Sequence, residues 1–133
     1  MSKSLIFTSN TSSQSVNAGS AVVLGSVVHR NGCNCYLLNN SIQCKGQGIY
    51  SVKSSITLSP TATGNVSVSI YKDGNALAGA TATETIATAG DTITLNPFGL
   101  FKIVCPCQNT SSITLVVSGA SSVSNVVVEV EKI

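Results

Sequence analysis

A strict alternation of apolar and small polar residues over residues 48–70 constrains the fold of this chain more than any other feature. In the first part of the stretch, four large apolar residues share one parity, namely Tyr50, Val52, Ile56 and Leu58. In the second part the same spacing recurs at Val66, Val68 and Ile70. Serine, threonine and lysine fill much of the other parity. A period of two is typical of a β-strand with one buried face and one solvated face.

Two turn signals divide this region. Residues 61–64 read Thr-Ala-Thr-Gly, and Asp73-Gly74 follows the second apolar run. Asp and Gly accept positive φ, so the second signal predicts a tight hairpin into residues 76–78. Short turns join neighbouring antiparallel strands, and we therefore expect the three strands to form one antiparallel sheet.

Short segments of the same kind fill the rest of the chain. We expect strands at residues 5–7, 21–29, 33–38, 42–45, 92–95, 100–104, 113–117 and 126–133. Residues 81–89 fit an edge strand or a loop, and Gly25 either bends residues 21–29 or lies in a strand covered on both faces. Apolar residues do not recur at helical spacing over two turns. About nine short strands separated by turn signals predict an all-β sandwich or barrel.

Composition bounds the class of protein. A chain of 133 residues predicts a single domain, here spanning 1–133, with an N-terminal strand and polar connection in residues 1–20. Charged residues make up 9% and hydrophobic residues 43%, with many β-branched side chains, so the chain is expected to fold. The net charge is +2 and the seven basic residues are scattered singly, which argues against nucleic acid as a partner.

The N-terminus carries an apolar patch at residues 5–7 that is shorter than the core of a secretory signal. No apolar run reaches the length of a membrane-spanning helix. We therefore expect a protein that is made in the cytoplasm without a signal peptide and either stays there or leaves by lysis or another route that needs no signal.

Three short motifs carry a family resemblance. Gly48-Ile49-Tyr50 opens the strongest strand, residues 70–74 close a hairpin, and residues 90–93 (Gly-Asp-Thr-Ile) open the next strong strand. Their order and spacing resemble the C1q/TNF-like jelly roll. The chain also resembles small bacterial and prophage-encoded jelly-roll proteins that form trimeric fibre tips or capsid decorations. The resemblance implies an antiparallel jelly-roll sandwich and a homotrimer.

Five apolar residues lie on the parity opposite to the expected core face: Ile49, Tyr71, Val116, Val127 and Ile133. Apolar residues at such positions can cover a subunit interface, so these five are the interface candidates. The alternative is that each is a singly exposed apolar residue, as is common on protein surfaces.

The five cysteines are Cys33, Cys35, Cys44, Cys105 and Cys107. Cys-Asn-Cys and Cys-Pro-Cys each place two thiols on one face of an extended strand, so the two pairs together could form a four-thiolate zinc site. A second hypothesis is a cross-link between these two segments, with at least one thiol left free. A third is that the cysteines are reduced and buried as small hydrophobes.

The sequence offers little for catalysis. His29 is the only histidine, and the carboxylates are explained by turns or by a charged row on the last strand. We therefore predict a non-enzymatic structural or adhesive module without a cofactor, of the kind found as a phage or prophage virion appendage, with a cell-surface or virion protein as a further partner. The alternatives are a cysteine-based metal-binding protein and a monomeric carbohydrate-binding jelly roll, for which the only tyrosine platforms are Tyr36, Tyr50 and Tyr71.

Overall fold

The computed structural model describes residues 4–104 and 110–133. These residues form twelve strands and no helix. The strands are β1 (Leu5–Asn10), β2 (Gln14–Val16), β3 (Ser26–Asn31), β4 (Cys35–Leu38), β5 (Ser41–Cys44), β6 (Gly48–Pro60), β7 (Gly64–Lys72), β8 (Asn75–Ile86), β9 (Ile93–Leu95), β10 (Phe98–Ile103), β11 (Ser111–Val117) and β12 (Ser121–Lys132).

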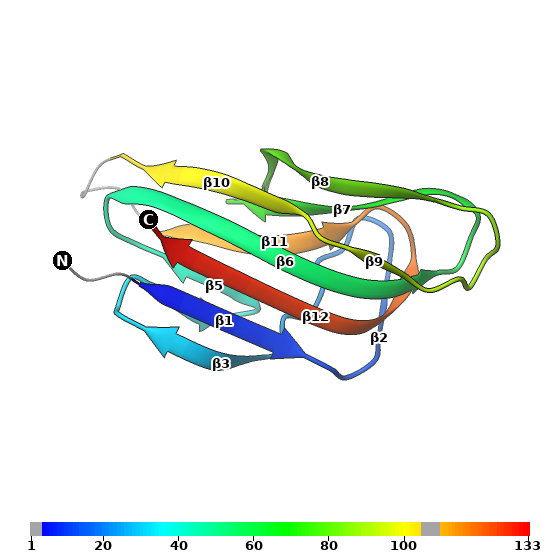
Figure 1. The fold of residues 1–133 in the computed structure, drawn as a ribbon, viewed down its shortest axis with the longest axis horizontal. Coiled ribbons are helices and arrows are strands. Elements are labelled where there is room, and N and C mark those ends of the chain that lie inside the picture. The colour runs from blue at the N-terminus through cyan, green and yellow to red at the C-terminus, as the bar shows by residue number, and fades with distance from the viewer. Residues whose placement is uncertain (1–3, 105–109) are drawn as a thin grey trace.

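The strands form two antiparallel sheets that pack face to face (Figure 1). The seven-stranded sheet has the order β10-β6-β12-β1-β3, with β9 pairing to β6 and β2 pairing to β12. The five-stranded sheet has the order β4-β5-β11-β7-β8. Neighbours in both sheets are mostly distant in sequence, as in a jelly roll, and this confirms the predicted all-β jelly-roll sandwich.

One detail of the prediction was wrong. The three strands expected to form a single sheet are divided, because β6 belongs to the seven-stranded sheet while β7 and β8 belong to the five-stranded sheet. The chain crosses between the sheets after Pro60, where the amide of Thr61 donates to the carbonyl oxygen of Ala120 at 3.0 Å. An alternating pattern shows that each strand has one buried face. It does not distinguish strands that pair side by side from strands that face each other across a core.

The hairpin prediction at Asp73-Gly74 is confirmed. Asp73 has φ of 53° and Gly74 has φ of 84°, and the turn joins β7 directly to β8. Two central residues with positive φ match the twist of a two-residue hairpin. β8 lies at the edge of its sheet and runs to Ile86, so the weakly patterned residues 81–86 form an edge strand and not a loop.

The region before β3 differs from the expected strand over residues 21–29. Val22 and Leu24 are fully buried, but the strand begins only at Ser26. Gly25 breaks the segment, with φ of 88°, and a Cβ atom there would overlap the carbonyl oxygen of Ser9. The bend at the glycine therefore lets Val22 and Leu24 enter the core before the chain turns into the sheet edge.

The predicted polar connection within residues 1–20 also holds a short strand. β2 has only three residues, which is too few for an alternating pattern to be recognised, and its Val16 is buried beside β12. Such short strands explain why the described residues hold more strands than the sequence suggested.

The core lies between the sheets and takes the inward side chains of both. Its fully buried members include Val52, Ile56 and Leu58 from β6, with Val68 and Ile70 from β7. These are the residues whose parity predicted burial. Burying a side chain of this size contributes about 1.5–3 kcal/mol relative to leaving it exposed.

Candidate interaction surface

The structure places the five interface candidates on two opposite faces of the sandwich. Ile49 on β6 and Val127 on β12 lie on the outer face of the seven-stranded sheet, and the amide of Ile133 donates to the carbonyl oxygen of Ile49 at 2.8 Å. Tyr71 on β7 and Val116 on β11 lie on the outer face of the five-stranded sheet. The two groups therefore cannot form one continuous patch.

The outer face of the seven-stranded sheet is ordered by strand register. One cross-strand row consists of Phe98, Lys53, Glu129 and Phe7. The next row consists of Leu100, Ser51, Glu131 and Leu5. Directly opposed side chains on one face lie close enough to interact. Strands from both ends and the middle of the chain thus bring aromatic, aliphatic and charged groups together on this face.

Exposed large apolar side chains are concentrated in this sheet. Within its strands, Phe98 is 60% exposed, Leu100 is 52% and Ile49 is 45%. Val27 and Val28 on the edge strand β3 are also exposed. Among the described strands of the other sheet, only Leu38 is a large hydrophobic side chain exposed to this degree. Clustered exposed apolar groups mark contact surfaces more often than scattered ones do.

The sequence-based candidates did not include Phe98 or Leu100. The strand was expected to begin at Leu100, so Phe98 fell outside the expected strand. Both parities of β10 carry large apolar residues, since Phe101 and Ile103 are buried while Phe98 and Leu100 are exposed. Only the pairing with β6 decides which parity points outward, and no pattern within β10 itself provides that information.

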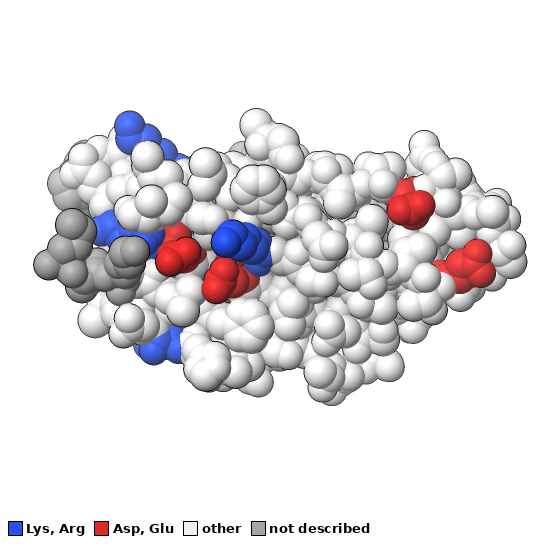
Figure 2. Space-filling model, in the orientation of Figure 1, with Lys and Arg blue, Asp and Glu red and all other residues white. Residues whose placement is uncertain are grey.

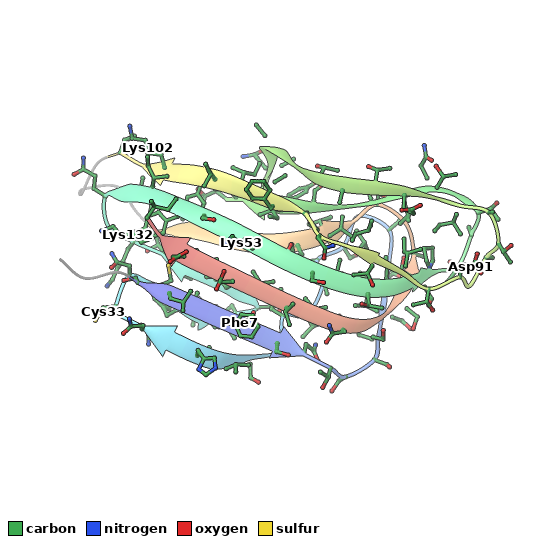
Figure 3. The ribbon with its side chains drawn as sticks, in the orientation of Figure 1. Phe7, Cys33, Lys53, Asp91, Lys102 and Lys132 are labelled. Carbon is green, nitrogen blue, oxygen red and sulfur yellow. The ribbon has the colours of Figure 1, made fainter. Side chains whose placement is uncertain are left out.

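A shallow depression lies on the same face. It has a volume of about 220 Å³ and is lined by Phe7, Lys53, Ser54, Ser55, Val127 and Glu129. Two of its lining residues, Lys53 and Glu129, are directly opposed in the β6–β12 register. Phe7 and Lys53 are labelled in Figure 3 on β1 and β6. A shallow hollow with both apolar and charged walls suits a protruding side chain from another protein surface.

Charges on this face are mixed in sign. In the space-filling view, blue and red groups lie close together in the left half and centre, and white surface fills much of the rest (Figure 2). A face on which acidic and basic groups alternate with uncharged surface differs from the basic stripe that nucleic-acid binding requires.

The tyrosines provide little exposed aromatic surface. Tyr50 is fully buried, as its parity predicted, and its ring stacks on Phe101, with ring centroids 5.0 Å apart, so it provides no platform for a sugar. Its hydroxyl donates to the carbonyl oxygens of Lys45 and Gly46 at 2.9 and 2.8 Å. Burial, together with the neighbouring Cys35 and Cys44, raises the pKa of the Tyr50 hydroxyl to about 12.

Tyr36 and Tyr71, the other two predicted platforms, are half-buried on the outer side of the five-stranded sheet. Neither projects freely from the surface, as a side chain that stacks on a sugar ring needs to do.

Three of the five cysteines lie in the described residues. Cys35 and Cys44 are directly opposed on β4 and β5 and are both buried, while Cys33 is exposed. Cys105 and Cys107 lie outside the described residues. Within residues 4–104 and 110–133, no three His, Cys, Asp or Glu side chains are placed to hold a metal ion together.

His29 lies on β3, opposite Phe7 on β1, and the two rings are 6.4 Å apart at a tilt of 32°. The imidazole thus packs beside an aromatic ring at the sheet edge.

Of three comparisons with known proteins, the one with solved structures identifies the fold. No protein-family model matches the chain, and no curated protein matches its sequence. Solved structures do match over nearly the whole chain. Murine APRIL at pH 5.0 superposes with a TM-score of 0.77 at 15% identity, covering 98% of this chain and 99% of APRIL. The globular domain of zebrafish complement 1qA superposes with a TM-score of 0.69 at 6% identity, covering 96% of this chain and 94% of that domain.

A vertex protein also matches. The PRD1 vertex protein P5 superposes with a TM-score of 0.59 at 16% identity, covering 99% of this chain and 97% of that one. The fold is therefore the C1q/TNF-like jelly roll that the three short motifs suggested.

Among the described residues, no helix is long and apolar enough to cross a membrane.

Proposed function

We propose that this protein is a non-enzymatic structural or adhesive module that assembles as a homotrimer, of the type found in phage or prophage virion appendages. The single observation that carries the proposal is the concentration of exposed apolar side chains on the strands of the seven-stranded sheet, with Phe98, Leu100 and Ile49 its most exposed members on the outer face.

The face suits association between copies. Phe98 and Leu100 lie on β10 at one edge of the sheet, and Phe7 and Val127 lie nearer its centre beside the depression. An edge that projects aromatic and aliphatic groups and a centre that provides a shallow hollow are complementary features of one surface. Heterologous contact of this kind between successive subunits closes into a ring when the rotation between them is right, and the family resemblance implies three subunits.

The virion role is supported by the breadth of the structural match to the vertex protein P5 of PRD1. A β-sandwich suits a rigid surface module, and this one has many hydroxyl side chains and only 9% charged residues. A protein on the outside of a particle needs a further partner, and a cell-surface or virion protein fills that role. The chain is then virion-associated or released by lysis.

Light scattering coupled to size exclusion tests the assembly. We expect a mass close to three times the 13.6 kDa of the monomer. A monomeric mass across the micromolar range removes the proposal and favours the monomeric carbohydrate-binding alternative, which glycan-array binding then tests directly.

Mass spectrometry of purified virions induced from the host tests the location. Peptides of this chain should co-purify with capsid or tail proteins through a density gradient. Recovery of the chain only in the soluble fraction contradicts the virion role. The trimer is tested separately, by the mass from light scattering.

A further inference from the structure

Cys35 and Cys44 form an unusually close pair. They are directly opposed on the β4–β5 hairpin, and their sulfur atoms are 2.6 Å apart. Cys35 is 2% exposed and Cys44 is fully buried. Two non-bonded thiols keep a larger separation than this, so the hairpin holds the sulfurs nearer to a disulfide's length than to that of an ordinary contact.

The hairpin's hydrogen bonds explain the approach. The amide of Lys45 donates to the carbonyl oxygen of Asn34 at 2.8 Å, which joins the residue after Cys44 to the residue before Cys35. In an antiparallel ladder this bond flanks a non-hydrogen-bonded pair, the type in which opposed side chains lie closest. The backbone therefore presents the two sulfurs to each other before any bond is made between them.

Surrounding contacts hold the pair in place. The side-chain amide of Asn34 donates to the carbonyl oxygen of Lys45 at 2.7 Å, across the open end of the hairpin. The guanidinium of Arg30 donates to the carbonyl oxygen of Cys35 at 2.8 Å and ties β3 to β4. These bonds fix the strands on both sides of Cys35, so the pair gains little freedom by remaining unlinked.

We propose that Cys35 and Cys44 form a cross-strand disulfide when the protein meets a small-molecule disulfide oxidant, with oxidised glutathione as the probe. One cysteine thiolate attacks a sulfur of the oxidant, which forms a mixed disulfide and releases one glutathione thiolate. The other cysteine thiolate attacks the protein sulfur of the mixed disulfide, which forms the Cys35–Cys44 bond and releases the second glutathione. The two cysteines lose two electrons and two protons, and the oxidant gains them.

The burial of the pair sets when the reaction occurs. The hydrogen bond to Cys35 and burial raise the pKa of the Cys44 thiol above its ordinary value, so little thiolate is present in the closed hairpin. Reaction therefore proceeds during folding or when the edge hairpin opens. The link is absent in a reducing cytoplasm and forms after release into an oxidising medium.

This assignment differs from the cross-link suggested by sequence spacing, which joined the Cys33–Cys35 segment to Cys105 and Cys107. Here Cys35 has its partner nine residues away within its own hairpin. Exposed Cys33 remains accessible for other thiol chemistry.

The test is refolding with oxidised or reduced glutathione, followed by alkylation of free thiols under denaturing conditions and peptide mass mapping. We expect a peptide pair joined through Cys35 and Cys44, lighter than the reduced pair by two hydrogen atoms. The oxidised protein should melt roughly 5–10 °C above the reduced protein, because the link restricts the unfolded chain. Recovery of Cys35 and Cys44 as alkylated thiols after oxidative refolding overturns the proposal.

Two variants remove ambiguity. In the variant with Cys33→Ser, Cys105→Ser and Cys107→Ser, only the proposed pair remains, and the melting difference between oxidised and reduced protein should persist. In the variant with Cys35→Ala and Cys44→Ala, the difference should vanish. Two outcomes contradict the proposal. One is a disulfide that links Cys35 or Cys44 to another cysteine in the wild type, and the other is a disulfide-linked dimer of the triple serine variant on a non-reducing gel. If a variant fails to fold, peptide mapping of the wild type alone decides.

Discussion

The two outer faces of this sandwich differ although the two inner faces are alike. Both sheets direct fully buried aliphatic residues into a common core, such as Ile56 from β6 and Leu115 from β11. Outside, the seven-stranded sheet carries exposed Phe98 and Leu100, while the paired outward positions of β7 and β8 are mainly hydroxyl residues such as Ser69 and Thr81.

The difference separates folding from association. The inner faces account for the fold, because burial there is complete within one chain. The outward apolar groups of the seven-stranded sheet, such as Phe98 and Leu100, take no part in that burial and remain exposed in the single subunit. The outer face of the seven-stranded sheet exposes large apolar groups, whereas the outer face of the five-stranded sheet carries mainly hydroxyl groups. This difference is expected if the apolar face is covered when subunits assemble as proposed.

The largest expected effect comes from charging the two faces separately. Phe98→Glu with Leu100→Glu should convert the proposed trimer to monomer in light scattering, since two carboxylates would be desolvated in every subunit contact. The matched change on the other sheet, Tyr71→Glu with Val116→Glu, should leave the mass unchanged. If both double variants dissociate equally while keeping the native circular dichroism spectrum, the two outer faces do not differ in their role in assembly.

The next effect tests whether both sheets contribute equally to the core. Ile56→Ala and Leu115→Ala should each lower the free energy of unfolding by about 2–5 kcal/mol, because each leaves a cavity among fully buried neighbours. The adjacent outward change Val116→Ala should cost well under half as much. Urea titration at one fixed protein concentration measures these values, since dissociation and unfolding are coupled in an oligomer. A much smaller loss at one of the two buried sites indicates that its sheet is loosely packed.

The sequence predicted the inner faces far better than the outer ones. Alternation identified Tyr50, Val52 and Ile56 as buried, and the turn chemistry of Asp73-Gly74 located a hairpin. These signals are local, since they depend on the strand period and on φ preferences. The division of β6 and β7 between two sheets is not local, and the pattern of each strand fits either arrangement equally well.

The candidate surface was harder to predict for the same reason. Ile49 and Val127 were identified by parity, but Phe98 became a candidate only when β10 was paired to β6 opposite Lys53. The closeness of Cys35 and Cys44 likewise requires the register of the β4–β5 hairpin. Spacing in the sequence drew attention to the Cys-x-Cys pairs, whose thiols share a face of an extended strand, and it contained no signal that Cys35 lies opposite Cys44.

A third effect concerns pH and Tyr50 on β6, whose hydroxyl donates hydrogen bonds to the connection that leads from β5 to β6. The folded-state pKa of Tyr50 is about 12, above the ordinary value near 10, so this group stabilises the fold fully below pH 10. The stabilisation is lost as pH rises from about 10 to about 12, by an amount of roughly 2–3 kcal/mol.

Urea titrations between pH 9 and pH 12 measure this slope for the reduced protein. Tyr50→Phe should be less stable at neutral pH, because its two hydrogen bonds are lost, but its stability should fall less steeply over the same interval. Parallel slopes for the wild type and the variant would assign the alkaline loss to other groups, with the Cys44 thiol as the next candidate because its pKa is also raised.

The smallest effect compares hydroxyl pairs on the two outer faces. Thr94 pairs with Thr57 at 3.1 Å on the seven-stranded sheet, and Thr81 pairs with Ser69 at 2.9 Å on the five-stranded sheet. Thr94→Val and Thr81→Val should each change the free energy of unfolding by no more than about 0.5–1 kcal/mol, because water replaces the lost partner at an exposed site. Thermal melts of the two variants at equal concentration provide the comparison. A distinctly larger loss at Thr94 means that the remaining Thr57 hydroxyl is shielded from water, and the covered surface then extends from Phe98 and Leu100 along the face to β9.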